Sequence, residues 1–239
     1  MKSSTSKFWA IVPAAGLGER FSSSRPKQFH QLRGKTVAEH TLEKLLSIKL
    51  IEKLICPCDI SSPYWSGVSV LKDSRIEMVS GGITRADSVM NGLVALQKLA
   101  KADDWVLVHD IARPCITVSD VIRLIGAVQT SSVGGLLVKY VDETLKMVGQ
   151  QNNVLKTLDR EQYRIAQTPQ MFRLKILFDA LALAKKNNVN PTDEASAVEA
   201  VGRDVLMIEG RKDNIKLTHQ EDLVIAESIL KAQEENLCV

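Results

Sequence analysis

A glycine-rich segment near the start of the chain combines small residues with positive charge. It follows an apolar run and spans residues 11–27, and Arg20 and Lys27 lie within it. Its small residues are Ala14, Ala15, Gly16 and Gly18. Such residues let backbone N–H groups approach an anion closely, so with two cations nearby the segment suits a triphosphate. The alternative is an ordinary strand followed by a small-residue turn, and the two cations favour the phosphate-binding interpretation.

Two better-known phosphate-binding motifs do not fit this region. A dinucleotide-binding fingerprint would need a glycine or alanine at the position of Phe21. A P-loop that ends in Gly34-Lys35-Thr36 would need its first glycine at the position of Phe29. That tripeptide is therefore predicted to be a turn ahead of a helix.

A carboxylate directly follows one of the predicted buried strands. Asp110 comes directly after residues 105–109, which places it at the carboxyl end of a central strand. Ligands bind at that edge of open α/β sheets, and a carboxylate beside phosphate groups is a candidate to hold Mg²⁺. The alternative is that Asp110 caps the turn or pairs with Arg113. Because a phosphate-binding turn is also present, the metal interpretation is favoured.

A second glycine pair, Gly81-Gly82, also precedes a predicted helix that begins near Arg85 and contains Ser88. Its glycines permit close backbone approach, and a helix N-terminus adds partial positive charge. A simple loop with capping residues explains the local sequence equally well. Both interpretations stay open at this stage.

Other polar clusters lie at the ends of predicted elements. They are Asp159-Arg160, Thr168-Pro169-Gln170, Thr192-Asp193-Glu194 and Asp213-Asn214-Ile215-Lys216. Each is most simply a cap or a turn, and the Thr192 cluster closely matches a helix start. His109 ends a buried strand and is more typical of a core residue than of a base. No pattern indicates nucleophilic or histidine-based catalysis.

Strands and helices that would position these residues alternate along the chain. Apolar runs without strict alternation predict buried strands at residues 8–12, 53–58, 76–79, 105–109 and 135–141. Helical patterns occupy 37–48, 86–99 and 118–128, and later 174–186, 193–201 and 219–233, with a strand at 204–208. This order predicts an α/β fold with a mostly parallel sheet and helices on both faces.

The segment 142–160 interrupts that alternation. It is polar, its centre at 149–153 is typical of a turn, and short β-prone runs flank it. We expect a projecting hairpin, and such hairpins often serve assembly.

Composition bounds the class of protein. The chain has 239 residues, 45% of them hydrophobic, and a formal net charge of +3. Those values predict a single domain over 1–239 and give no reason to expect nucleic-acid binding. The sequence also contains no apolar stretch long enough to span a membrane. Four cysteines lack the spacing of a disulfide framework or a zinc site, which favours a cytoplasmic protein.

Together the motifs resemble a known family. They read PAAGLGERF with PKQF, GGITRADSV, VHDIARP, ETLK, LDR, AQTPQMF, TDEASAVE and GRKDNIKLT. In this order and spacing they resemble the 2-C-methyl-D-erythritol 4-phosphate cytidylyltransferases of the non-mevalonate isoprenoid pathway. The resemblance implies a Rossmann-like nucleotidyltransferase fold of glycosyltransferase-A type and a homodimer joined through an arm at about 140–164. It also implies Mg²⁺-dependent attack of a sugar-alcohol phosphate on the α-phosphorus of CTP.

The same resemblance assigns roles to individual residues. Nucleotide contacts are implied for Pro13, Ala14, Ala15, Gly16, Gly18, Gly82, Arg85 and Ser88. Catalytic charges are implied for Arg20, Lys27, Arg160 and Lys216. Substrate contacts are implied for Asp110, Arg113, Thr144, Arg160, Thr168, Thr192 and Lys216, with Asp110 also near the metal. Thr144 and Arg160 would come from the arm of a second subunit.

The chain departs from the family pattern at two positions. Ile83 stands where members often carry Asp, so a side-chain contact to the nucleotide made there would be lost. Ile111 replaces a small Ala behind Asp110. Neither change removes a proposed catalytic charge, so an active enzyme is expected. The alternatives are a ribitol 5-phosphate cytidylyltransferase and a catalytically silent nucleotide-binding or assembly protein of the same fold.

Overall fold

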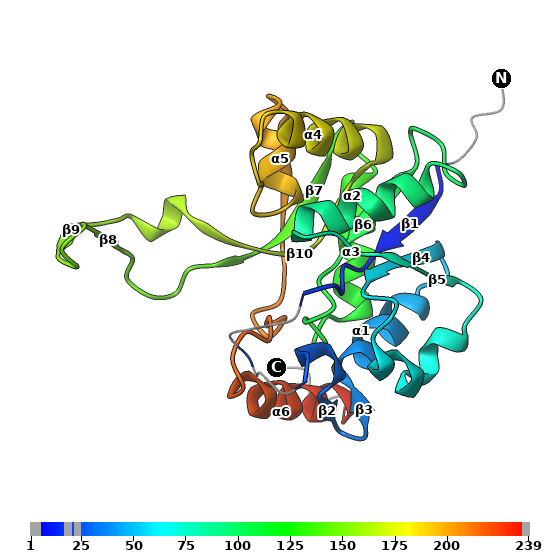
Figure 1. Cartoon of the computed structure of the whole chain (residues 1–239). Coiled ribbons are helices and arrows are strands. Elements are labelled where there is room, and N and C mark those ends of the chain that lie inside the picture. The colour runs from blue at the N-terminus through cyan, green and yellow to red at the C-terminus, as the bar shows by residue number, and fades with distance from the viewer. Residues whose placement is uncertain (1–5, 17–20, 22–24, 236–239) are drawn as a thin grey trace.

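The computed structural model describes residues 6–16, 21 and 25–235. These residues form a seven-stranded sheet in the order β11-β7-β10-β6-β1-β4-β5 (Figure 1). Its strands are β1 Phe8–Ile11, β4 Ile51–Cys58, β5 Ile76–Ser80, β6 Trp105–Val108, β7 Gly134–Tyr140, β10 Arg164–Arg173 and β11 Leu206–Glu209. Strand β10 runs antiparallel to β6 and β7, and the other pairings are parallel. The predicted mostly parallel α/β sheet is confirmed.

Helices cover both faces of this sheet. They are α1 Val37–Leu46, α2 Arg85–Leu96, α3 Val118–Val128, α4 Leu174–Lys186, α5 Glu194–Ala200 and α6 Asp222–Glu234. One core packs α1, α3 and α6 against the sheet, and the other packs α2, α4 and α5 (Figure 1). Along β1, Ala10 belongs to the first core while Trp9 and Ile11 belong to the second. The central strands are therefore buried on both faces, which explains why their sequences lack alternation.

Short elements connect the larger ones. The 3₁₀ helices are Lys27–Phe29, Pro63–Gly67, Ser69–Lys72 and Arg160–Gln162, and the strands β2 Gln31–Leu32 and β3 Lys35–Thr36 form a small antiparallel pair. Gly34 lies between β2 and β3 with φ +80°, a value that favours glycine. Thr36 then caps α1 through a capping box with Glu39. The interpretation of Gly34-Lys35-Thr36 as a turn before a helix is confirmed for Gly34, whereas Lys35 and Thr36 form β3 directly ahead of α1.

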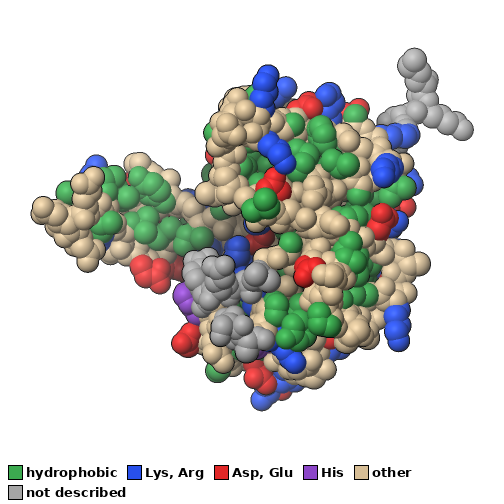
Figure 2. All heavy atoms as spheres, in the orientation of Figure 1, with side chains coloured by type: hydrophobic (Ala, Val, Ile, Leu, Met, Phe, Trp, Pro, Cys, Tyr) green, Lys and Arg blue, Asp and Glu red, His purple; other side chains and the backbone are tan. Residues whose placement is uncertain are grey.

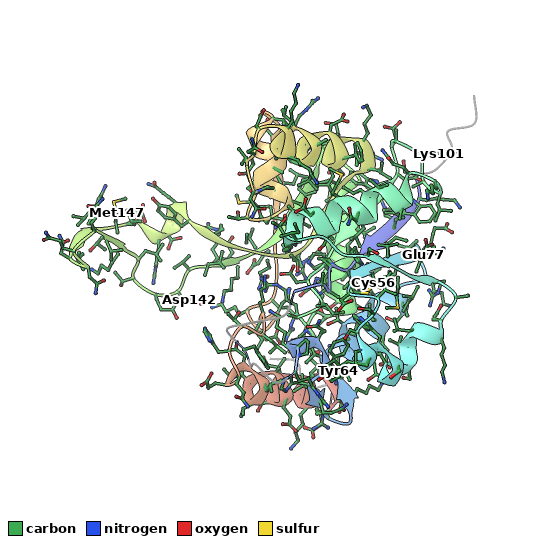
Figure 3. All side chains as sticks on the ribbon, viewed as in Figure 1. Cys56, Tyr64, Glu77, Lys101, Asp142 and Met147 are labelled. Atoms are coloured by element: carbon green, nitrogen blue, oxygen red, sulfur yellow. The ribbon has the colours of Figure 1, made fainter. Side chains whose placement is uncertain are left out.

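A long arm leaves the body between β7 and β10 (Figure 1). Its outer part is the antiparallel pair β8 Lys146–Val148 and β9 Val154–Thr157. Asp142 lies at its root and Met147 near its tip (Figure 3). The predicted projecting hairpin is therefore present. Within the described residues, no helix has the length and apolar character needed to cross a membrane.

Candidate active site

An open pocket lies at the carboxyl edge of the sheet, where β1 and β6 end. Among the described residues its lining comes from the first glycine turn, the 3₁₀ helix at Lys27, the start of α2, the end of β6 and the segment before α6. The lining residues are Pro13, Ala14, Ala15, Gly16, Lys27, Gln28, Gly82, Ile83, Thr84, Arg85, Ser88, Asp110, Ile111, Ala112 and Lys216. The phosphate-binding turn and the Gly81-Gly82 loop thus meet at one site.

Close packing of backbone shapes the wall on the glycine side. A Cβ atom at Gly81 would lie 2.4 Å from Cβ of Ala15, and one at Gly82 would lie 2.2 Å from Cβ of Asp87. Gly82 N–H donates to Oγ of Ser88 at 3.0 Å, and the Ser88 hydroxyl in turn donates to the Thr84 carbonyl. Ser88 therefore fixes the loop that precedes α2, and both glycines are needed for the chain to fit.

The turn at Ala14 is held from two sides. Its N–H donates to the carbonyl of Pro57 at 2.8 Å, which extends the pairing of β1 with β4. The amide of Gln28 donates to the Ala14 carbonyl at 3.0 Å. Gln28 was not singled out in the sequence, because a glutamine after Lys27 carries no recognisable signal. Lys27 lines the same wall and donates to the carbonyl of Leu217 at 3.0 Å.

Asp110 lies among cationic side chains at the floor of the pocket. Its Oδ1 accepts from Nε of Arg85 at 2.7 Å, and its Oδ2 lies 2.8 Å from Nζ of Lys216 and 3.8 Å from Nε of Arg113. Burial favours the protonated form, but the three cations outweigh it and hold the pKa of Asp110 well below its usual range. The carboxylate is therefore charged at neutral pH, and Arg113 is its most distant partner of the three.

Arg85 joins Asp110 to a second, deeper carboxylate. Its Nη1 and Nη2 donate to the two oxygens of Glu194 at 2.7 and 2.9 Å. Burial opposes the charged guanidinium, but Glu194 and Asp110 more than compensate and raise the pKa of Arg85. The sequence did not reveal Glu194 as part of the site, because Thr192-Asp193-Glu194 closely matches a helix start.

Buried hydrogen bonds also fix the backbone of Asp110, on the side away from the pocket. The Asp110 N–H donates to Oγ1 of Thr168 at 3.1 Å, and Oγ1 lies 3.1 Å from Nδ1 of His109. The other ring nitrogen, Nε2, lies 3.2 Å from the carbonyl of Arg113. A carbonyl only accepts, so Nε2 carries the hydrogen and Nδ1 accepts from the Thr168 hydroxyl. Burial lowers the pKa of His109 to about 4, which keeps the ring neutral.

Several residues assigned by the family resemblance lie away from this lining. Thr168 is buried behind Asp110, and Arg113 donates to the carbonyl of Asn214 at 2.8 Å. Thr192 is exposed ahead of α5. Thr144 and Arg160 lie on the exposed arm, where Arg160 donates to the carbonyl of Asp142. Gly18 and Arg20 lie outside the described residues. The remaining assigned residues line the pocket.

The oxygen ligands available in the pocket suit a metal ion that is bound together with the phosphates of a substrate. Asp110 is the only carboxylate among the described residues that line the pocket, and the described part of the chain contains no cluster of three or more metal-binding side chains. Mg²⁺ is commonly bound by one or two carboxylates together with substrate phosphates. The site fits that mode, in which the ion would share Asp110 with the cations that now contact both its oxygens.

The fold and the pocket together define a nucleotidyltransferase. Small-residue backbone, Lys27, Lys216 and the carboxylate of Asp110 meet at the carboxyl edge of an α/β sheet, which is the place and the chemistry that phosphate groups require.

Comparison with known proteins identifies the family. The family model of 2-C-methyl-D-erythritol 4-phosphate cytidylyltransferase (IspD) matches residues 8–232. A curated protein of that name from Aliivibrio fischeri is 43% identical over 226 residues, covering 95% of this chain and 94% of its own. One from Pseudomonas savastanoi pv. phaseolicola is 45% identical over 224 residues, with coverage of 93% and 95%. The chain belongs to the 2-C-methyl-D-erythritol 4-phosphate cytidylyltransferase family.

A solved structure agrees with this assignment. The crystal structure of 2-C-methyl-D-erythritol 4-phosphate cytidylyltransferase from Francisella tularensis aligns with a TM-score of 0.81 at 37% identity, over 94% of this chain and 100% of that one. The resemblance drawn from the sequence motifs, and the fold it implies, are therefore confirmed.

Proposed function

We propose that this protein transfers the CMP group of CTP to 2-C-methyl-D-erythritol 4-phosphate in isoprenoid precursor biosynthesis. The products are 4-diphosphocytidyl-2-C-methyl-D-erythritol and pyrophosphate. The proposal rests on one observation, which is that residues distant in the sequence lie together in one pocket. The first glycine turn, Asp110 and Lys216 are far apart in the sequence and line one pocket in a chain of this family.

The reaction is an in-line displacement at phosphorus. An oxygen of the acceptor's phosphate forms a bond to the α-phosphorus of CTP, and the bond from that phosphorus to the bridging oxygen breaks. Pyrophosphate leaves with the electron pair. The attacking phosphate is already an anion, so no strong general base is required, and none lines the pocket among the described residues.

Positioning and charge then supply the catalysis. Backbone N–H groups of Ala15 and Gly16 and the ammonium of Lys27 suit the triphosphate of CTP. Lys216, which is half exposed beside Asp110, suits the phosphate of the acceptor. Arg20 is proposed to stabilise the transition state together with Lys27, as the family resemblance implies.

We propose Mg²⁺ as the cofactor. When bound with the nucleotide, the ion neutralises charge on the phosphate oxygens. Asp110 is the residue that would hold it. The carboxylate suits this role because the surrounding cations keep it ionised.

A homodimer through the arm completes the proposal. Met147, Val148, Val154 and Leu155 are exposed on the arm, and Figure 2 shows its hydrophobic side chains gathered on one visible face. An isolated two-stranded hairpin is marginally stable in water, so this surface suits contact with a second copy. Thr144 and Arg160 are exposed on the arm and do not line the pocket of their own chain. In the dimer, Arg160 of the partner subunit would reach the acceptor's phosphate.

We further propose that the protein is cytoplasmic and binds neither nucleic acid nor membranes. The described cysteines Cys56, Cys58 and Cys115 are free and buried, which suits a reducing compartment. The small net charge of +3 gives no electrostatic footprint for nucleic acid.

The test is pyrophosphate release with paired acceptors. We expect release only when CTP, Mg²⁺ and methylerythritol phosphate are all present. Release without the acceptor, or faster turnover of ribitol 5-phosphate, would refute the proposed acceptor, and no release with either would favour a silent protein.

A second test addresses the dimer. Light scattering should report a dimer for the full chain and a monomer when residues 145–158 are replaced by a short glycine-containing turn. A monomeric full chain, or a shortened variant that stays dimeric and fully active, would refute the role of the arm.

A further inference from the structure

Glu194 is a buried carboxylate that does not line the pocket but contacts a residue that does. Its side chain is 1% exposed, and both of its oxygens accept hydrogen bonds from the guanidinium of Arg85. The third directed contact of Arg85 is made by Nε, which donates to Asp110. The planar guanidinium of Arg85 therefore connects Glu194 on α5 to Asp110 at the floor of the pocket.

Glu194 is not needed to start its own helix. Asp193 is the N-cap of α5 and accepts from Ser196 N–H at 2.9 Å in a capping box. The N–H of Ala195 donates to Oε1 of Gln170 at 2.8 Å. The amides of Ala195 and Ser196 therefore have acceptors other than Glu194. Since an unpaired buried carboxylate would be costly, the contact with Arg85 accounts for the burial of Glu194.

The contact also decides how Arg85 meets Asp110. A guanidinium can approach a carboxylate with two parallel N–H groups and occupy both oxygens. Here both terminal nitrogens donate to Glu194, which fixes the plane of the guanidinium, and Nε is the Arg85 nitrogen that donates to Asp110, at Oδ1. Oδ2 is left facing Lys216 at 2.8 Å.

We propose that Glu194 is a positioning residue for the transfer reaction, acting through Arg85 to keep one oxygen of Asp110 available to Lys216 and to the ligands of the pocket. This inference rests on the proposed function. Glu194 touches no substrate. It fixes the orientation of Arg85, and Arg85 in turn sets which oxygen of Asp110 faces the reacting groups.

The main test is Glu194→Gln, which keeps the size of the side chain but turns one of the two acceptors into a donor facing Arg85. Displacing a catalytic group by about 1 Å can cost ~10²-fold in rate, so we expect kcat to fall by about that factor. The affinity for CTP, measured by titration calorimetry, should change by less than about ten-fold, because Lys27 and the turn amides remain. Glu199→Gln is the matched control, since Glu199 is exposed on the same helix.

A crystal structure of Glu194→Gln provides a readout that needs no turnover. We expect the Arg85 Nε contact with Asp110 Oδ1 to be replaced by a different arrangement. An unchanged 2.7 Å contact would overturn the proposal, as would a parental kcat or an equal loss of kcat and CTP affinity. If the parent itself releases no pyrophosphate, the proposed function fails, whereas the crystal structure still decides whether Glu194 orients Arg85.

A double variant covers the case in which Glu194→Gln does not fold. Glu194→Gln combined with Arg85→Met leaves neither member of the buried pair charged. If Glu194 acts through Arg85, the double variant should be no slower than Arg85→Met alone. A double variant slower than Arg85→Met by ten-fold or more would show that Glu194 acts by another route and would overturn the proposal.

Discussion

The neutral, buried His109 makes the stability of the protein depend on pH in a defined window. Burial lowers its pKa from 6.5 to about 4 in the folded protein. Between those two values the unfolded chain binds a proton that the folded chain does not, so stability decreases as the pH falls from 6.5 to 4. At ~1.4 kcal/mol for each pH unit between the two pKa values, the full loss is about 3 kcal/mol.

The assay is urea unfolding at fixed protein concentration from pH 7 to pH 4, for the parent and for His109→Gln. The glutamine amide can still donate to the carbonyl of Arg113 but does not titrate, so the variant should lose about 3 kcal/mol less than the parent over this window. Burial also lowers the pKa of His40, but that residue is present in both proteins and cancels in the difference. His219→Gln, at an exposed position, is the control and should follow the parent.

Equal pH dependence in the parent and in His109→Gln would refute this reasoning. It would mean that His109 is accessible to protons in the folded protein. The hydrogen-bond pattern from Arg113 through His109 and Thr168 to Asp110 would then be wrong as well, because it requires an unprotonated Nδ1.

Three further predictions follow from the site. Thr168→Val leaves the Asp110 N–H and His109 Nδ1 without a partner, so urea unfolding should show a loss of about 1–3 kcal/mol that Thr168→Ser largely restores; equal stability of the valine and serine variants would contradict this. Lys216→Met should lower kcat by about 10²- to 10³-fold with a smaller change in CTP affinity, and an unchanged kcat in a pyrophosphate assay would be evidence against its role. Ile83 is fully exposed in the pocket lining, at a position where family members often carry Asp, so Ile83→Asp should leave the melting temperature unchanged and strengthen CTP binding several-fold by restoring a side-chain contact to the nucleotide. Ile225→Asp, at an exposed position of α6, is its control, and equal CTP affinities in the two variants would refute the prediction.

Most of the fold could be predicted because its strands and helices have the sequence periodicities of buried elements. Strand β10 was missed. Thr168-Pro169-Gln170 has the composition of a turn, and the pairing of β10 with β7 is interrupted between Ala166 and Gln170. Its strand conformation depends on β6 and β7, two neighbours that local sequence does not specify.

The pocket was predictable where chemistry and chain position coincide. Asp110 follows a strand directly, and the two glycine loops precede helices, so their convergence follows from the rule for open α/β sheets. Glu194 was not recognised because its partner Arg85 is 109 residues away in the sequence. The short-range pattern around Glu194 was fully explained by a helix start.

Because the residues of the pocket are far apart in the sequence, they are synthesised at different times. Lys27 contacts Leu217 across 190 residues, and Lys216 is among the last residues of the site to be made. A ribosome adds roughly 5–20 residues each second, so for roughly 5–20 seconds the nascent chain contains the glycine turn and Asp110 without Lys216. A chain that ends before Lys216 therefore has the glycine side of the pocket but lacks the lysine beside Asp110, and it becomes competent for the proposed reaction only after Lys216 has been added.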